Sequence, residues 1–381
     1  MEKTSKVEDI RKEPLIRKRW GFIKTKPSTY SDGILVTGPN SFLGSHIVKL
    51  LQSKWKGEIH LLLRSTSQKE AIKKMKDAFN SWELGNFDAD NFSIHLGDVS
   101  LNMMGLSNTE YSDLKRNVGF VLHLAMNPLY HLPYAHFNRL WLPELSRMIS
   151  FCGDKRSPKS LHYPSSYNAN FFTTNNDFNR LNTNAWQSGY AGFKWVANEV
   201  LKNAFDQNLN GCLYDIPLVI GSEEKGICPA HYSIWHILDM FLKTGYFIDF
   251  EFKIIPVDIL SEIIVSNLIT DKNGHGEQFL RPALDEAVTD VQFSHTVASI
   301  LGLEQTDCET IREACFSKRR FDFMFPPHFY SIIEKVNALP AILPKNFDRQ
   351  KLPSTAMVFL SNLNRILSAQ PELNKLANYK S

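Results

Sequence analysis

Cysteine is scarce in this sequence. The 381 residues include five cysteines, an odd number, and no two of them have the CxxC spacing of redox and zinc motifs. They are Cys152, Cys212, Cys228, Cys308 and Cys315. This usage argues against a disulfide framework and a zinc site, and it predicts a reducing, cytoplasmic location.

Long apolar runs are also missing. No stretch approaches the roughly 20 apolar residues that a membrane-spanning helix needs, so we expect no membrane span. Neither sign of charge dominates, because 43 Lys and Arg residues face 40 Asp and Glu residues, for a formal net charge of +3. A nucleic-acid-binding protein would need a concentrated basic face, so no nucleic-acid partner is expected.

The one local imbalance of charge lies in residues 1–30, where Lys and Arg clearly outnumber Asp and Glu. We interpret this segment as a basic arm, solvated on one side and packed on the body on the other. A targeting peptide is disfavoured, because the segment lacks an apolar core and contains Glu8, Asp9 and Glu13.

Short apolar runs alternate with amphipathic segments through the first 220 residues. Nearly all-apolar strands that alternate with helices indicate a parallel sheet covered on both faces. The predicted fold is therefore α/β, a Rossmann-type doubly wound parallel sheet. The predicted strands are 33–37, 59–63, 92–96, 118–125, 161–163 and 212–220, and the predicted helices are 45–54, 68–79 and 190–205.

After Gly221 the alternation stops. We expect a nucleotide-binding domain over 31–222 and a smaller, mainly helical substrate-binding region over 223–381, with about 252–262 returning to the first domain. A strand is predicted within that returning segment, from Lys253 to Asp258. Phe-rich segments such as 321–330 suit either plain core packing or the lining of a substrate pocket.

A short turn between the first strand and the first helix has the composition of a dinucleotide-binding turn. Such a turn directs backbone N–H groups and a helix N-terminus at a pyrophosphate, and its glycines allow close approach and positive φ. Gly38 and Gly44 are present, whereas Ser41 replaces the middle glycine and would either crowd the pyrophosphate or donate to it. The residues expected to contact a cofactor here are Thr37, Gly38, Asn40, Ser41, Phe42 and Leu43.

Three further strand ends complete the predicted cofactor site. Arg64 follows the second strand, where an NAD site carries a carboxylate; a cation suits the 2′-phosphate of NADP, so NADPH is the predicted cofactor. The alternative is an ordinary exposed arginine. Asp98 and Val99 close the third strand, where a carboxylate can accept from adenine. Leu124 and Ala125 follow the fourth, where a small side chain lets the cofactor cross the sheet edge.

Tyr190 and Lys194 lie at positions i and i+4 of a predicted helix and therefore share one face. An ammonium one turn away lowers the pKa of a phenol from its usual value of about 10, so we expect Tyr190 and Lys194 to be a catalytic pair. Both are also expected to contact the cofactor, Lys194 through the nicotinamide ribose hydroxyls; the alternative is an ordinary surface pair on an amphipathic helix. Ser166, after the fifth strand, is the favoured partner for a developing oxyanion, with Ser165 as the alternative. Asn138 suits a proton-relay water and a helix cap equally.

Together these residues resemble the extended short-chain dehydrogenases and, within them, the thioester reductase family. That family includes the terminal reductase domains of nonribosomal peptide and polyketide synthases and the reductase domain of carboxylic acid reductases. The resemblance covers about residues 30–270. The matching motifs are Thr37-Gly38 with Phe42-Leu43-Gly44, Arg64, Gly97-Asp98, Ser165-Ser166, Gly189-Tyr190, Lys194-Trp195 and Pro256-Val257-Asp258.

The sequence departs from the family pattern at four positions. Ser41 stands in place of a glycine, Ser166 of a threonine, Phe193 of a serine and Asp215 of an arginine. These departures put cofactor affinity and the acyl group in question. The tyrosine and lysine of the family remain as Tyr190 and Lys194.

The resemblance implies NADPH-dependent reduction of an acyl thioester to an aldehyde, with a second hydride giving the alcohol. Its substrate would be held on the phosphopantetheine arm of an acyl or peptidyl carrier protein, or on coenzyme A. The chain would act in trans as a stand-alone reductase of natural product biosynthesis. Two alternatives remain open: an extended dehydrogenase or epimerase acting on a small soluble metabolite, and a non-catalytic NADP-binding regulator.

Overall fold

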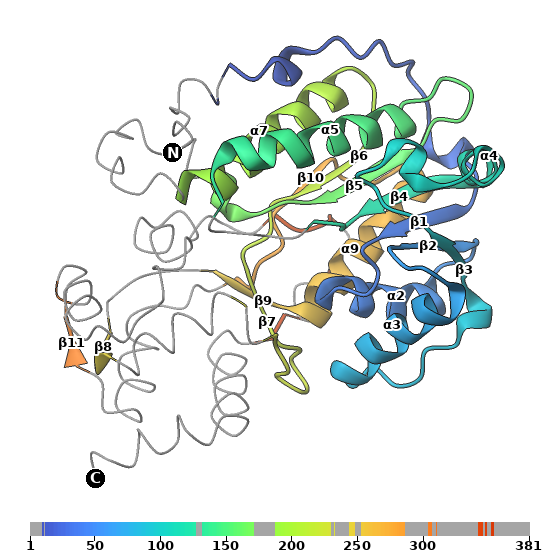
Figure 1. Ribbon diagram of the computed structural model, residues 1–381. Helices are drawn as coiled ribbons and strands as arrows, with labels where there is room; N and C mark the ends of the chain where they lie inside the picture. The colour runs from blue at the N-terminus through green and yellow to red at the C-terminus, as the bar shows by residue number, and fades with distance from the viewer. Residues whose placement is uncertain are drawn as a thin grey trace. The chain divides into compact units, whose positions relative to one another are not determined.

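A seven-stranded parallel sheet is the centre of the computed structural model (Figure 1). Its strand order is β10-β6-β5-β4-β1-β2-β3, and every neighbouring pair is parallel. The predicted α/β, Rossmann-type sheet is confirmed. The strands are β1 (Gly33–Thr37), β2 (Ile59–Leu63), β3 (Ser93–Leu96), β4 (Val118–His123), β5 (Ser160–Pro164), β6 (Asn210–Tyr214) and β10 (Phe279–Leu280).

The structure describes a defined part of the chain. The described residues are 10, 12–126, 132–170, 187–229, 232, 244–247, 253–285, 304–306, 310, 342–345, 347–348 and 352–353.

Helices cover both faces of the sheet. α5 and α7 lie side by side on one face, and α2, α3 and α9 lie on the other (Figure 1). Strands β1, β2 and β4 are buried throughout, which explains why they are almost entirely apolar. The helices are α2 (Phe42–Lys54), α3 (Gln68–Ser81), α4 (Asn108–Asn117), α5 (Tyr134–Cys152), α7 (Gln187–Asp206) and α9 (Val257–Lys272).

Short 3-10 helices occupy several connections. They are η1 (Pro14–Arg17), η2 (Pro27–Thr29), η3 (Ala89–Asn91), η4 (Asn102–Gly105) and η5 (Tyr167–Asn170). In η4, Met103 and Met104 have positive φ angles of 50° and 58°, a left-handed conformation that is rare for such side chains. No described helix is long and apolar enough to cross a membrane.

The predicted strand over 212–220 is wrong, because two separate strands occupy that segment. β6 ends at Tyr214, and β7 (Leu218–Ile220) pairs instead with β9 (Ile254–Pro256) in a second, two-stranded sheet. Pro217 lies between them, and it has no N–H to donate to a sheet neighbour. The expected strand at 253–258 is correspondingly shorter, since α9 begins at Val257.

Two compact units divide the chain. The first consists of residues 1–216, 261–281 and 342–347, and the second of 217–260, 282–341 and 348–381. Two further short strands, β8 (Tyr246–Phe247) and β11 (Glu304–Gln305), pair in the second unit. These units are defined by packing, whereas the predicted domains were defined by function and stay predictions.

The N-terminal arm is fixed to α7 and its neighbours by specific hydrogen bonds. The carbonyl of Lys18 accepts from Asn203 at 2.8 Å and from Gln207 at 2.9 Å, and Gln207 in turn accepts from the backbone N–H of Trp20 at 2.7 Å. Ile10 is fully buried. In Figure 1 the arm is the blue trace that runs along the upper edge, over α5 and α7.

Candidate active site

The turn after β1 needs both of its glycines. Gly38 has a φ of +66°, and a Cβ there would lie 3.0 Å from the Cα of Ala125. A Cβ on Gly44 would lie 2.3 Å from the carbonyl oxygen of Gly38. The backbone therefore folds back on itself at the start of α2, where a helix N-terminus and its free N–H groups favour an anion.

Ser41 closes this turn from within. Its hydroxyl donates to the carbonyl of Gly38 at 2.8 Å and accepts from the N–H of Gly44 at 3.0 Å, so Ser41 is the N-cap of α2. The cap also explains why α2 begins at Phe42, three residues before the predicted start. Both hydrogen bonds of the Ser41 hydroxyl are made within the turn, so the side chain that stands in place of the middle glycine stabilises that turn.

The other predicted residues of the turn differ in exposure. Asn40 is exposed and Leu43 is half-buried, whereas Phe42 is buried with its ring 4.8 Å from that of Trp82. The side chain of Phe42 therefore belongs to the core, and only its backbone N–H is placed at the helix start.

Thr37 connects the ends of β1 and β4. Its buried hydroxyl oxygen accepts from the N–H of Leu124 at 3.2 Å and from that of Ala125 at 3.1 Å, and lies 2.8 Å from Nδ1 of His123. Thus four residues that were predicted to contact the cofactor (Thr37, Gly38, Leu124 and Ala125) lie together at one edge of the sheet.

Arg64 and Asp98 lie at the ends of β2 and β3. Their side chains approach to 3.9 Å, and the Arg64 side chain is 74% exposed. An exposed pair at this distance contributes little to stability, so Arg64 is available to a phosphate. One oxygen of Asp98 accepts from the N–H of Ser100 at 2.8 Å, and Val99 is buried beside it.

Tyr190 and Lys194 lie in the first half of α7 and are both buried. The Nζ atom of Lys194 is 5.8 Å from the centre of the Tyr190 ring. It lies 3.4 Å from the Tyr163 hydroxyl and 3.4 Å from the carbonyl of Pro164, both long for hydrogen bonds of an ammonium. Burial lowers the pKa of Lys194 to about 7.

The two serines after β5 have different environments. Ser165 is buried and donates to Oδ1 of Asn198 on α7 at 2.5 Å. Ser166 is half-buried, and its hydroxyl oxygen accepts from the N–H of Asn168 at 3.3 Å. An acceptor bond leaves the Ser166 proton free to be donated, whereas the Ser165 proton is already donated to Asn198. This geometry favours Ser166 over Ser165 as an oxyanion donor.

Asp215, a departure from the family pattern, is neutralised by a residue far along the chain. Its Oδ2 accepts from Nε of Arg281 at 2.9 Å and from Asn170 at 2.8 Å. Its buried Oδ1 has no hydrogen-bond partner within the described part of the chain. Burial raises the pKa of this carboxyl, and the bonds from Asn170 and Arg281 oppose that effect. Through these bonds Asp215 links Arg281, which follows β10, to Asn170 of η5. The helix η5 begins at the residue after Ser166.

Two residues near this site were not foreseen. Tyr163 lies beside Lys194, and His123 packs its ring 5.9 Å from that of Tyr163 while contacting Thr37. His123 ends the otherwise apolar strand β4, and a polar residue at the end of such a strand is the signal that could have identified it. β5 contains Ser160 and His162 besides Tyr163, so its sequence does not single out Tyr163. Asn138, by contrast, donates to Glu13 of the arm at 3.1 Å.

A nicotinamide dinucleotide fits the groups at this sheet edge: a glycine turn at a helix N-terminus, an exposed arginine, a carboxylate after β3 and a buried lysine. Among the described residues, no three His, Cys, Asp or Glu side chains are arranged to hold a metal ion. The Phe-rich turn at 321–330 lies outside the described residues.

A family model decides the relationship. The family described as male sterility protein, whose model represents an NAD-binding region, matches residues 36–264. The chain belongs to this family. The match runs from β1 into α9, so it includes each strand end discussed above, and the predicted family resemblance is confirmed.

Relatives of this male sterility family member are larger proteins. A segment of 259 residues, 64% of this chain, is 23% identical to one of the proteins of linear gramicidin synthase from Brevibacillus parabrevis and covers 5% of it. Another, 61% of this chain, is 22% identical to L-2-aminoadipate reductase of Saccharomyces cerevisiae and covers 18% of it. The chain thus spans only a small part of the length of these relatives.

Solved structures share the fold. The terminal R domain from the myxalamid PKS-NRPS biosynthetic pathway has a TM-score of 0.70 at 16% identity, with 95% of this chain and 98% of that domain covered. A thiolation-reductase di-domain from an archaeal non-ribosomal peptide synthetase has a TM-score of 0.68 at 14% identity, with 97% and 82% covered.

Proposed function

We propose that this protein is an NADPH-dependent reductase that converts an acyl thioester to an aldehyde and, with a second hydride, to the alcohol. The observation that carries the proposal is the placement of Lys194. Its Nζ reaches the carbonyl of Pro164, immediately before Ser165 and Ser166, while Tyr190 lies one helical turn away on α7. Tyr190, Lys194 and Ser166, three groups suited to carbonyl chemistry, thus belong to the region at the carboxyl ends of the strands, where the Gly38 turn also lies.

Each of these groups has a distinct task. A nicotinamide cofactor, which the Gly38 turn and Lys194 would hold, would supply hydride to the thioester carbonyl carbon. Tyr190 and Ser166 donate hydrogen bonds to the carbonyl oxygen as it gains negative charge, and Tyr190 provides the proton. The Lys194 ammonium favours the phenolate form of Tyr190 afterwards and binds ribose hydroxyls. The carbonyl then re-forms as the carbon–sulfur bond breaks: Tyr190 takes its proton back from the oxygen and passes it to the departing thiolate, and the aldehyde and the thiol are released.

Arg64 supports NADPH rather than NADH. Its guanidinium is exposed and only loosely paired with Asp98, so a 2′-phosphate can recruit it without breaking a strong interaction. NADH offers a neutral hydroxyl at that position, which gains nothing from a cation. We therefore expect Arg64→Ala to weaken NADPH binding and leave NADH binding unchanged.

The thioester is proposed to be held by a carrier protein supplied in trans, with coenzyme A as the alternative. Two similarities support this: one to a solved thiolation-reductase di-domain, and one to the Drosophila melanogaster protein fatty acyl-CoA reductase wat, 35% identical over 25% of this chain and covering 20% of that relative. The first similarity points to the thiol of a carrier protein and the second to that of coenzyme A, so an experiment must distinguish the two.

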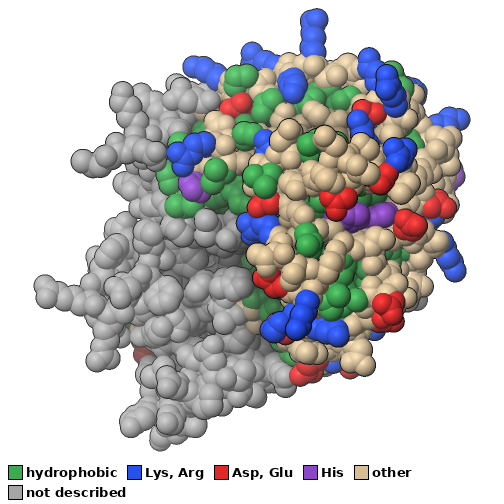
Figure 2. Space-filling model, turned by 45° about the vertical axis from the view of Figure 1, so that its right-hand side comes forward, with side chains coloured by type: hydrophobic (Ala, Val, Ile, Leu, Met, Phe, Trp, Pro, Cys, Tyr) green, Lys and Arg blue, Asp and Glu red, His purple; other side chains and the backbone are tan. Residues whose placement is uncertain are grey.

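The N-terminal arm suits an acidic carrier. Arg17, Arg19 and Lys24 are exposed, and no ion pair involves them within the described residues. Figure 2 shows cationic side chains along the upper part of the molecule. Because the arm is hydrogen-bonded to α7, these charges are held on an ordered surface, and we assign carrier docking to them.

Loss of absorbance at 340 nm tests the proposal, with NADPH and acyl groups presented on a carrier, on coenzyme A and on free pantetheine. Turnover that Tyr190→Phe abolishes supports the reductase, and product analysis separates aldehyde from alcohol. Turnover only with free ketones or nucleotide sugars would instead support an extended dehydrogenase or epimerase that acts on a small soluble metabolite. Cofactor binding without turnover on any substrate would favour a regulator.

The docking surface has its own control. Charge reversal at Arg17, Arg19 and Lys24 should lower kcat/KM about tenfold for the carrier-bound substrate and leave the pantetheine substrate unaffected. The same reversal at Lys49, Lys56 and Lys76, exposed on or next to α2 and α3, should change neither. Equal effects of the two triple variants would show that only overall charge matters.

A further inference from the structure

Glu144 is a buried acid on α5, opposite the ends of β1 and β4. Only 2% of it is exposed, and its Oε1 lies 3.3 Å from Nε2 of His123. His123 is the last residue of β4 and lies in register with Thr37, the last residue of β1. Burying a charged group at this depth is strongly unfavourable unless it has a specific partner.

The direction of the hydrogen bonds follows from the single proton of Thr37. Its hydroxyl oxygen already accepts from the N–H groups of Leu124 and Ala125, so the proton is donated to Nδ1 of His123. A neutral imidazole with an accepting Nδ1 carries its proton on Nε2, the atom that lies 3.3 Å from Oε1 of Glu144. The chain Glu144–His123–Thr37 therefore ends on the backbone that lies against Gly38.

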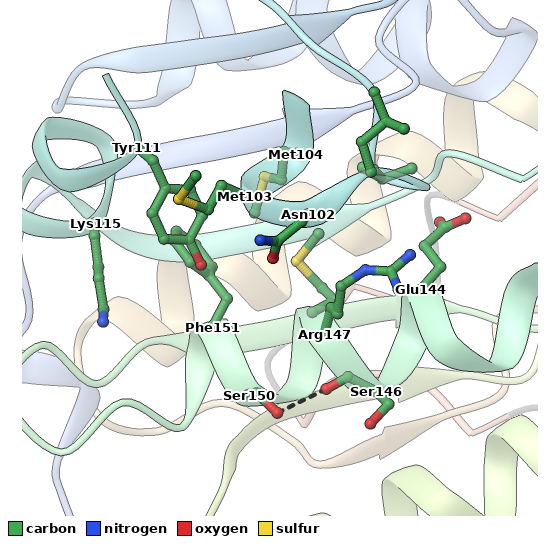
Figure 3. Close-up of a pocket in the computed structure, with 13 residues that line it drawn as sticks. Asn102, Met103, Met104, Tyr111, Lys115, Glu144, Ser146, Arg147, Ser150 and Phe151 are labelled. Atoms are coloured by element: carbon green, nitrogen blue, oxygen red, sulfur yellow. Dashed lines mark hydrogen bonds between the residues drawn. The ribbon is translucent and has the colours of Figure 1, made fainter. Parts of the chain in front are cut away.

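Arg147 lies one turn further along α5 and contacts the segment that follows a third strand, β3. Its guanidinium donates to the carbonyl of Ser100 at 2.6 Å, and the N–H of Ser100 is held by Asp98 at 2.8 Å. The loop after β3 is thus tied to the same helix. Figure 3 shows the side chains of Glu144 and Arg147 extending from the same side of α5.

We propose that Glu144 and Arg147 are positioning residues for the dinucleotide: from one face of α5 they hold the three strand ends, of β1, β4 and β3, between which the cofactor is bound. This inference rests on the proposed function, since it presumes NADPH at that edge. Neither residue touches the reacting atoms. Glu144 fixes the separation of the Gly38 turn from Ala125, and Arg147 fixes the loop that presents Asp98 and Val99.

A cavity beside the two residues supports a role beyond plain packing. It has a volume of about 260 Å³ and is bounded by η4, α4 and α5. Oε2 of Glu144 and Nε of Arg147 are buried there and have no hydrogen-bond partner among the residues that the structure describes. Two charged groups with unmet bonding capacity are a poor way to stabilise a core. Their retention at this place is understandable if their other bonds shape the cofactor site.

Dissociation constants for NADP⁺, measured by calorimetry on full-length variants, test the inference. Glu144→Leu removes the carboxylate that lies against His123, and Arg147→Met removes the donor to Ser100; each should weaken binding about tenfold. Glu144→Gln keeps an acceptor oxygen and should stay within about twofold of the wild type. Arg139→Met, an exposed position on the same helix, is the matched control and should change nothing.

A kinetic readout separates positioning from general damage. At saturating NADPH, the KM for the thioester should be unchanged in Glu144→Leu and Arg147→Met, while the KM for NADPH rises. Arg147 is only half-buried, so its variant remains informative should Glu144→Leu fail to fold. NADP⁺ binding equal to that of the wild type in folded Arg147→Met, or an equal rise in both KM values, would overturn the inference. A wild type that binds no NADP⁺ would instead refute the proposed function.

Discussion

A buried lysine lies at each end of β5, and the surroundings of the two lysines differ. Lys159, at the amino end, donates to the carbonyl of Ser157 at 2.6 Å and to its hydroxyl at 3.1 Å, and lies 4.7 Å from the centre of the Phe151 ring. Lys194, at the carboxyl end, has two contacts of 3.4 Å. Burial lowers the pKa of Lys159 to about 8 and that of Lys194 to about 7.

Burial alone therefore does not distinguish the two lysines; the quality of their hydrogen bonds does. Lys159 is satisfied by its own neighbours, which is what a structural residue needs. Lys194 has donors that its contacts only weakly engage, so it can bind a further acceptor without breaking strong bonds. The same contrast separates Ser165, whose proton is donated to Asn198, from Ser166, whose proton is free.

The largest expected effect is on catalysis. Lys194→Met should lower kcat/KM for thioester reduction by about a thousandfold, because the ammonium beside Tyr190 is lost. Lys159→Met should stay within about twofold, since its contacts end at the other edge of the sheet. Steady-state NADPH oxidation measures both. A comparable loss of kcat/KM in the two variants would show that the different hydrogen bonding of the two lysines does not matter for catalysis.

The serine pair should follow the same rule with a smaller effect. Ser166→Ala should reduce kcat about a hundredfold, the usual range for removing one oxyanion donor. Ser165→Ala should keep most of the activity and lose about 1 kcal/mol of unfolding free energy with its bond to Asn198. Rates and urea unfolding curves, measured side by side, would refute this ordering if Ser165→Ala proved the less active.

Cofactor binding should depend on pH through Lys194. Its pKa is about 7 in the free protein, so above that pH the protein must take up a proton to present an ammonium to the cofactor. The affinity for NADP⁺ should therefore fall up to about tenfold per pH unit as pH rises from about 7 to 8.5. Calorimetry at several pH values measures this, and Lys194→Met should have a flatter profile.

The smallest expected effect is on stability. The pKa of Lys194 is lower in the folded than in the unfolded state, so burying the ammonium destabilises the fold fully below about pH 7, and the penalty disappears as pH rises toward the unfolded value of about 10.4. Lys194→Met should thus raise Tm by at least about 2 °C at pH 6.5 and less at pH 9.5.

Lys159→Met should gain less, because it also leaves the carbonyl of Ser157 without its donor. Thermal unfolding of both variants at the two pH values provides the check. A Tm gain that does not change with pH in Lys194→Met would contradict the assignment of the destabilisation to a buried charge.

The local hydrophobic pattern was enough to predict the strands of the large sheet from β1 to β5, because buried parallel strands are mostly continuous apolar runs. The position of the turn at Gly38 followed from its glycines. The hydrophobic pattern failed at Pro217, where one apolar run holds two strands of different sheets. An unbroken hydrophobic pattern does not tell which neighbour a strand pairs with; only the missing N–H of Pro217 hinted at the boundary.

The candidate site shows a similar limit. That Tyr190 and Lys194 share one helix could be predicted, because their spacing is local, one turn of a helix. The partnership of Asp215 with Arg281 could not, since the two residues are 66 positions apart and meet only when β10 joins the sheet. Ser41 was foreseen as an intrusion, yet its hydroxyl caps α2, a role that needs the three-dimensional turn to be seen.

The position of β10 at the edge of the sheet has a consequence for how the chain can fold during synthesis. His162 and Asp215 are buried, and their polar partners, Asp271 and Arg281, emerge from the ribosome much later. Until then a nascent chain would hold an incomplete sheet with unpaired polar groups at its rim. A shortened protein that stops at residue 222 should therefore aggregate, whereas one that continues through Arg281 has every strand of the large sheet.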